Sequence, residues 1–211
     1  MDDCLRGLSL RGFAPRAVAD IGAAEGSWTR HAMQYWPDAS YFLFEPLEER
    51  DKQLAELART HRRIQIFKMA LGRSKAELTM GVTDDLYGSS LAYAGRSSRI
   101  VPVESLDTLL AEGRISAAEF LKIDVQGFEF EVLGGAERFL SGVEVAVIET
   151  YFFRFAPMMS LLHEMIAYMV ARGFRPYELV DQLRRPYDGA AGQCDVCFVR
   201  NNSSLLAVGQ W

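Results

Sequence analysis

Residues 17–29, AVADIGAAEGSWT, constrain the fold of this chain more than any other stretch. The stretch begins with small apolar residues, as a buried parallel strand does. Gly22 and Gly26 allow a tight turn and a close approach of a ligand to the backbone. Ser27 is expected to cap a helix that begins at Trp28. This order is typical of the first βα unit of a nucleotide-binding α/β domain, although an ordinary βα turn can share it.

The charge in this turn bears on the kind of ligand. A dinucleotide fingerprint reads GxGxxG and places a pyrophosphate at the helix N-terminus. Here the spacing is Asp20-x-Gly22-x-x-x-Gly26, with Glu25 inside the turn. Two carboxylates would repel a pyrophosphate but would suit the sulfonium and ammonium of S-adenosylmethionine. A carboxylate in a loop can also point to water, so both kinds of cofactor stay open at this point.

The composition fits one soluble domain over residues 1–211. The net charge of −5 gives no electrostatic footprint for nucleic acid. No apolar run reaches the roughly 18 residues of a membrane helix, and the N-terminus lacks the pattern of a secretory signal. Cys194 and Cys197 are expected on opposite faces of one strand, as reduced packing cysteines like Cys4. We therefore expect a cytoplasmic protein without membrane insertion.

Strands and helices alternate along the chain. Parallel strands are expected over residues 17–21, 41–44, 64–69, 120–123 and 143–148, and helices over 28–35, 47–59, 128–140 and 160–172. Residues 1–16 are expected to form an N-terminal helix and linker. Residues 74–106 interrupt the alternation, and strands at 76–82 and 100–103 predict an inserted antiparallel hairpin there. The last strands are expected at 174–180 and 194–200, before a tail, 201–211, that is loose or docked by Trp211.

Several carboxylates follow the predicted strands. Glu45, Asp124 and Glu149 each come directly after an apolar run, and Asp20 ends the first one. Because ligands of open parallel sheets bind beyond the carboxyl ends of the strands, we expect these four acids to converge on one cleft. Glu45 is placed to accept the hydroxyls of a ribose, or to cap the helix that follows. Asp20 is expected to hold the amino-acid end of the cofactor or to brace the loop.

Seven segments carry a family resemblance: DIGAAEG, FEP, ALG, SSL, VESLDTLL, LKIDVQGFEFEVLGGA and VIET, in this order. Together they resemble the FkbM family of S-adenosylmethionine-dependent methyltransferases, over about residues 18–200. The resemblance implies the class I methyltransferase fold, a Rossmann-like α/β architecture. Its seven-stranded, mostly parallel sheet has helices on both faces and an antiparallel last strand. The family mostly methylates oxygen on small molecules, such as sugars or polyketide-type metabolites.

The resemblance also assigns residues to the cofactor. The expected contacts with S-adenosylmethionine are Asp20, Gly22, Ala23, Glu25, Gly26, Trp28, Glu45, Pro46, Ala70, Leu71 and Asp124. There are two departures from the family pattern. Gln126 stands where the family more often has a glutamate. No acid follows the third strand to bind the adenine amine, so backbone groups, or Asp84 and Asp85 of the insertion, would have to do so.

Asp124 and Glu149 are the candidate catalytic bases for a hydroxylated small-molecule acceptor, with Asp124 ahead. The same two acids could instead hold Mg²⁺. The candidate acceptor-binding residues are Tyr87, Ser89, Ser90, Gln126, Glu129, Tyr151 and Phe152, and Glu129 could equally cap its helix. The alternatives to an O-methyltransferase are a cofactor-binding regulator or scaffold and, less favoured, a nicotinamide-dependent oxidoreductase. The sequence is also compatible with a homo-oligomer.

Overall fold

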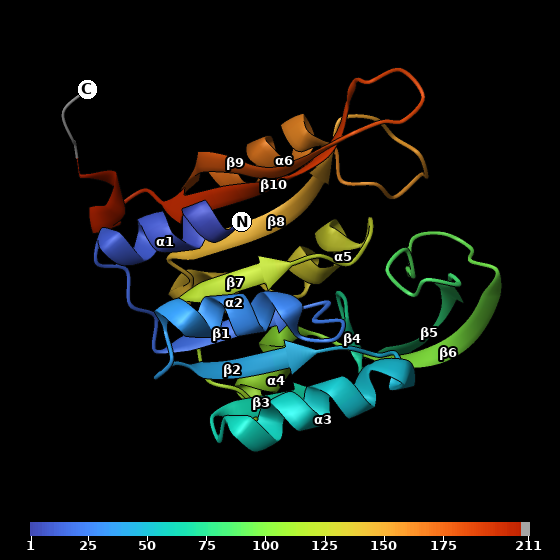
Figure 1. Cartoon of the computed structure of the whole chain (residues 1–211), viewed down its shortest axis with the longest axis horizontal. Helices are drawn as coiled ribbons and strands as arrows, with labels where there is room; N and C mark the ends of the chain where they lie inside the picture. The colour runs from blue at the N-terminus through green and yellow to red at the C-terminus, as the bar shows by residue number, and fades with distance from the viewer. Residues whose placement is uncertain (208–211) are drawn as a thin grey trace.

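The computed structural model describes residues 1–207, and a seven-stranded sheet forms its centre, in the order β3-β2-β1-β7-β8-β10-β9 (Figure 1). The strands are β1 (Ala17–Ile21), β2 (Ser40–Phe44), β3 (Ile64–Phe67), β7 (Phe120–Ile123), β8 (Val145–Tyr151), β9 (Phe174–Arg184) and β10 (Ala191–Arg200). β10 runs antiparallel to both of its neighbours, whereas β3, β2, β1, β7 and β8 pair in parallel. The predicted α/β sheet with an antiparallel last strand is confirmed.

Helices cover both faces of this sheet, as predicted. They are α1 (Asp2–Leu10), α2 (Ser27–Tyr35), α3 (Asp51–Thr60), α4 (Leu106–Ala111), α5 (Glu129–Gly134) and α6 (Leu162–Val170), with short 3-10 turns at Glu48–Arg50, Phe139–Gly142 and Ser204–Leu206. Buried side chains of α1, α2 and α3 pack in one core, and those of α4, α5 and α6 pack in another. Cys194 belongs to the second core and Cys197 to the first, so the two face opposite sides of β10.

A second, three-stranded sheet lies beyond the carboxyl end of β2 (Figure 1). It contains β4 (Ala70–Leu71), β6 (Ser97–Glu104) and β5 (Ala76–Val82), in that order. β5 and β6 pair antiparallel, which confirms the inserted hairpin. The sheet is larger than predicted, because β6 starts three residues earlier than expected and also pairs in parallel with β4.

Two predicted boundaries are wrong for tertiary reasons. β8 does not end before Glu149 but continues to Tyr151, because β10 pairs with it as far as Gln193. The helix expected over 128–140 ends as α5 at Gly134. A Cβ at Gly135 would lie 2.0 Å from the backbone oxygen of Gly72, so the chain turns there to pass close to another backbone segment.

Smaller differences concern caps and hairpins. Ser27 does not cap α2; it is the first residue of the helix, and Gly26 is the N-cap with a left-handed φ of 81°. β9 and β10 extend towards each other beyond the predicted ranges, to Arg184 and Ala191, and shorten the loop between them. None of the described helices has the length and apolar character needed to cross a membrane. Trp211, expected to dock the tail, lies outside the described residues.

Candidate functional site

The glycine turn after β1 takes the predicted form. Gly22 has a φ of 80°, and a Cβ there would lie only 1.9 Å from the backbone oxygen of Asp124. The backbone N–H groups of Gly22 and Ala23 both donate to the carbonyl of Phe44 at the end of β2. The turn is thus wedged between the ends of β2 and β7, and no residue with a side chain fits at Gly22 without moving one of them.

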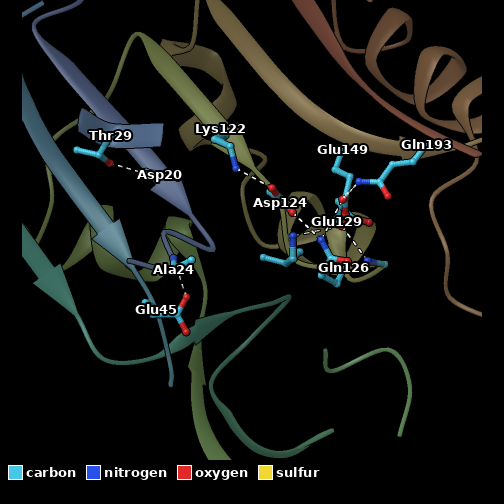
Figure 2. A network of polar contacts seen from close by, with 12 residues as sticks. Asp20, Ala24, Thr29, Glu45, Lys122, Asp124, Gln126, Glu129, Glu149 and Gln193 are labelled. Carbon is cyan, nitrogen blue, oxygen red and sulfur yellow. Dashed lines mark hydrogen bonds and ion pairs between the residues drawn. The ribbon is translucent and has the colours of Figure 1, made fainter. Parts of the chain in front are cut away.

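Glu45 connects this turn to the segment after β2 (Figure 2). Its Oε2 accepts from the backbone N–H of Ala24 at 2.9 Å, and its Oε1 accepts from that of Leu47 at 2.8 Å. Burial raises the pKa of this carboxyl, and the two amides act in the opposite direction. The bond to Leu47 agrees with the capping interpretation. Each oxygen keeps a lone pair that a ligand hydroxyl could also use.

A mostly apolar pocket lies next to Glu45, at the carboxyl ends of β1, β2 and β7. Its lining includes the predicted cofactor residues Gly22, Glu45, Pro46, Ala70, Leu71 and Asp124, together with Met69, Leu91, Val125 and Phe128. Asp84 and Asp85, suggested for the adenine amine, do not line it. Asp84 pairs with Arg96, and Asp85 accepts from the hydroxyl of Thr83 and the N–H of Gly88. The insertion contributes Tyr87 and Ser89 to this pocket instead.

Asp124 lies at the edge of the pocket, and its side chain is 33% exposed. Its Oδ2 is 3.0 Å from the Nζ of Lys122, a buried side chain of β7, and its Oδ1 accepts from the amide of Gln126 at 2.9 Å. Burial lowers the pKa of Lys122, but the carboxylates of Asp124, Asp20 and Asp195 outweigh it and raise that pKa above its usual range. Lys122 is thus a permanent cation behind Asp124.

Glu149 lies behind Gln126 and is 1% exposed. It accepts hydrogen bonds from the amides of Gln126, at 2.9 Å, and Gln193 (Figure 2). It also accepts from the hydroxyl of Tyr151 at 2.6 Å. Burial, together with the nearby charge of Asp124, raises its pKa well above the usual range. Glu149 does not line the pocket next to Glu45, so the two predicted bases differ in access: Asp124 is open and Glu149 is covered.

Asp20 is fully buried behind the glycine turn. Its Oδ2 accepts from the hydroxyl of Thr29 at 2.6 Å (Figure 2), and its Oδ1 is buried without a hydrogen-bond partner among residues 1–207. Burial raises its pKa, and Lys122 opposes that shift. Asp20 therefore does not join the open cleft with Glu45 and Asp124. Its position agrees with the predicted bracing role.

The predicted acceptor-binding residues separate into two groups. Tyr87, Ser89 and Gln126 line the pocket. The others hold neighbouring segments: Ser90 donates to the carbonyl of Gln126, Glu129 accepts from the N–H of Gly127 and the hydroxyl of Ser160, Tyr151 binds Glu149, and Phe152 packs against the core. Glu129 thus braces the turn before α5.

A Mg²⁺ site does not fit these residues. Among residues 1–207, no group of three or more His, Cys, Asp or Glu side chains could hold a metal ion. The amide nitrogen of Gln126 donates to both Asp124 and Glu149 and occupies the position between them. A hydrogen-bond donor, rather than a cation, therefore bridges the two acids.

A parallel sheet with this strand order, an antiparallel last strand and a glycine turn beside an acid after β2 defines the class I methyltransferase fold. A family model described as the methyltransferase FkbM domain matches residues 20–176. The chain therefore belongs to the FkbM family of S-adenosylmethionine-dependent methyltransferases. No sequence among the curated proteins matches it significantly.

Solved structures share the fold at low sequence identity. A methyltransferase FkbM from Methylobacillus flagellatus KT is 16% identical, with a TM-score of 0.57 over 86% of this chain. This chain spans only 43% of that protein. A 1,6-didemethyltoxoflavin N1-methyltransferase from Burkholderia thailandensis is 10% identical, with a TM-score of 0.56 over 95% of this chain and 76% of its own. Magnesium protoporphyrin IX methyltransferase from Synechocystis PCC 6803 is 13% identical, with a TM-score of 0.55 over 94% and 77%.

Proposed function

We propose that the chain transfers a methyl group from S-adenosylmethionine to a hydroxyl oxygen of a small molecule, such as a sugar or a polyketide-type metabolite. The observation that carries this proposal is the position of Asp124. Its partly exposed carboxylate lies at the edge of a pocket that has an amide-bound glutamate, Glu45, at the end of β2. That arrangement offers a cofactor site and a proton acceptor side by side.

The residues present fit S-adenosylmethionine. Gly22 leaves space that a Cβ would fill, and Glu45 is held by two backbone amides so that its free lone pairs can accept from ribose hydroxyls. Met69, Leu91 and Phe128 supply apolar surface for a base. Two of the structural neighbours described above were solved with S-adenosylhomocysteine and S-adenosylmethionine bound, which supports the same cofactor here.

When bound, S-adenosylmethionine supplies an electrophilic methyl group and leaves as a neutral thioether, so no general acid is needed. The acceptor hydroxyl must lose its proton as the O–C bond forms, and Asp124 is the exposed carboxylate that can receive it. Lys122 and Gln126 each donate to one oxygen of Asp124 and fix the direction of its remaining lone pairs. Most of the rate would come from aligning the acceptor, an effect worth up to about 7–11 kcal/mol in well-oriented systems.

Calorimetric titration with S-adenosylmethionine tests the cofactor site. We expect Glu45→Ala to weaken binding by about tenfold or more, because hydrogen bonds to a charged group contribute about 1.5–3 kcal/mol each. Glu48→Gln is the matched control, since Glu48 is a largely exposed acid nearby that does not line the pocket. NAD is the control ligand. Failure of the protein to bind S-adenosylmethionine, or equal binding of NAD, would refute the proposed cofactor.

Methyl transfer to a panel of hydroxylated small molecules, followed as S-adenosylhomocysteine production, tests the role of Asp124. We expect Asp124→Asn to lower kcat by about 10²–10⁴-fold, the usual contribution of a positioned base, while the Kd of S-adenosylmethionine changes little. Equal losses of kcat and cofactor affinity would instead assign Asp124 to binding. Cofactor binding without turnover on any acceptor would favour the regulator or scaffold alternative.

A further inference from the structure

A groove lies beside the turn that joins β9 to β10, and we call it the hairpin groove. Its lining includes Phe155, from the loop after β8, and Leu183, Arg184, Arg185, Tyr187 and Gln193 of the hairpin. It shares none of the described residues with the pocket next to Glu45. The loop after β8 and the hairpin turn both project beyond the carboxyl end of β8 (Figure 1). The hairpin groove is thus at the same edge of the sheet as the cofactor site, but outside it.

Two glutamine side chains join the hairpin groove to the reacting centre (Figure 2). Gln193 lines the groove and Gln126 lines the pocket, and both donate to the same oxygen of Glu149. Gln126 also donates to Asp124 at 2.9 Å. Three hydrogen bonds thus separate Gln193 from Asp124, a path of about 9 Å. A molecule with a hydroxyl at Asp124 reaches the groove only if it is longer than one six-membered ring.

Aromatic and apolar surface is exposed in the hairpin groove. Tyr187 is 90% exposed, Leu183 is 58% exposed and Phe155 is 57% exposed. The ring of Phe155 packs edge-on against Tyr151, with 6.1 Å between the ring centroids, so it is held in place beside the groove. Apolar side chains gathered around one hollow mark a binding site, whereas single exposed ones do not. A flat apolar ring fits this surface.

The charge in the hairpin groove is positive, although the chain as a whole carries a net charge of −5. Arg184 and Arg185 line it, and no carboxylate of residues 1–207 does. Arg185 pairs with Asp188, and its guanidinium lies 4.0 Å from the centroid of the Phe153 ring. Arg184 donates to the carbonyl of Gly189 and forms no ion pair within the described part of the chain. Its charge is therefore free to bind an anionic group.

We propose that the hairpin groove holds the far end of the methyl acceptor, and that this acceptor is an elongated, hydroxylated aromatic acid. Its hydroxyl would lie at Asp124, and its body would extend past Gln126 and Gln193. Its outer ring would lie against Tyr187, and its acidic group would lie near Arg184. Contacts at the far end would then align the hydroxyl with the methyl group. The inference rests on the proposed function, because it takes Asp124 as the proton acceptor.

Calorimetric titration of the protein saturated with S-adenosylhomocysteine tests the proposal with three probes. The first, 4′-hydroxybiphenyl-4-carboxylate, has a second ring and an acidic group. The second, 4′-hydroxybiphenyl-4-methanol, lacks the charge, and the third, 4-hydroxybenzoate, lacks the second ring. We expect the biphenyl acid to bind about tenfold more tightly than 4-hydroxybenzoate, because it buries a further ring. It should bind about threefold more tightly than the biphenyl alcohol, as expected for an exposed ion pair.

Two variants separate the roles of the ring and the charge. Tyr187→Ala should bring the affinity for the biphenyl acid to within about threefold of that for 4-hydroxybenzoate. Arg184→Gln should remove the preference for the acid over the alcohol. Ile100→Ala and Arg175→Gln are the matched controls, because both side chains are exposed and lie outside the groove, and they should leave all three affinities unchanged. Thermal unfolding checks that each variant is folded.

The proposal is overturned if the wild-type protein does not prefer the biphenyl acid, or if Tyr187→Ala binds this acid as tightly as the wild type does. Sedimentation of the same proteins tests a rival occupant. A wild-type dimer that Tyr187→Ala dissociates would show that a second copy covers the groove, and the acceptor assignment would be wrong. Failure to bind S-adenosylhomocysteine would refute the proposed function and this inference with it. Intact binding of S-adenosylhomocysteine without preference for the biphenyl acid overturns the inference alone.

Discussion

Gln126 is the residue through which the polar centre can be perturbed most sharply. Its amide nitrogen donates to Asp124 and to Glu149, at 2.9 Å in each case. Gln126→Glu would restore the residue that the family more often carries, yet it would place a third carboxylate between two others. Both donated hydrogen bonds would be lost and replaced by repulsion. We therefore expect a substitution that suits relatives to destabilise this chain.

The magnitude follows from these two bonds. A hydrogen bond to a charged group contributes about 1.5–3 kcal/mol, so losing two would cost about 3–6 kcal/mol if the new carboxyl stayed charged. In Gln126→Glu the new carboxyl can take up a proton and so donate one hydrogen bond again. This limits the loss in free energy of unfolding to about 3 kcal/mol at pH 8. For a chain of this size, such a loss lowers Tm by about 6–12 °C.

The pH dependence of the stability loss distinguishes the effect of the new charge from the effect of the lost hydrogen bonds. The carboxyl of the variant would have a higher pKa in the folded than in the unfolded state, so the native state binds more protons and stability falls as pH rises. The loss should therefore be small near pH 4 and largest at pH 8. Gln126→Met is the control, because it loses the same bonds and keeps the left-handed backbone (φ of 55°) without adding charge.

Urea unfolding of the wild type and both variants from pH 4 to pH 8 measures these losses. Parallel pH curves for Gln126→Glu and Gln126→Met would show that repulsion among the three carboxylates plays no part. A Gln126→Glu variant as stable as the wild type at pH 8 would refute the bridging role of this amide.

Two other predictions concern the glycine turn and Asp195 of β10. Gly22→Ala should lower the free energy of unfolding, measured in urea, by more than about 4 kcal/mol, because the new methyl group would meet the backbone of Asp124. Gly12→Ala is the control: Gly12 also has a positive φ, 87°, but lies in open space, so this variant should lose only about 1–2 kcal/mol. The pKa of Asp195, about 7 when folded, exceeds its unfolded value, so the native state binds the proton more tightly and the contribution of this one group to stability should fall between pH 4 and pH 8. Asp195→Asn should gain about 2–4 kcal/mol relative to the wild type over that range, and a constant difference would contradict the burial argument.

The central sheet could be predicted because its signals are local. Short apolar runs that end in glycine or an acid mark β1, β2 and β7, and the order of motifs identified the arrangement of the strands. The end of β8 could not be predicted, since Glu149 continues the strand only through pairing with β10, more than forty residues later. The early end of α5 likewise depends on the contact between Gly135 and Gly72, which no local pattern reveals.

The sequence predicted where the candidate site lies better than it predicted what each residue of the site does. Position after a strand placed Glu45 and Asp124 at the pocket correctly, because it depends only on the direction of the chain. The position of a residue after a strand gave no information about which of these side chains are buried. The burial of Asp195 was not predicted either: it is a lone acid between two cysteines in an otherwise apolar strand, on the side that faces a neighbouring core.

The acids at this edge of the sheet differ in how deeply they are buried and in how many hydrogen-bond donors surround them. Glu149 is buried and receives its hydrogen bonds from within the protein, and Asp20 is buried with one oxygen bonded to Thr29 and the other without a partner among residues 1–207. Asp124 is bonded on both oxygens but remains open, as a proton acceptor must be. Asp195 is covered and has no partner among residues 1–207, which is costly for the free protein. Of these acids, Asp124 alone is both hydrogen-bonded and open, and it is therefore the one that suits the proposed role of a proton acceptor.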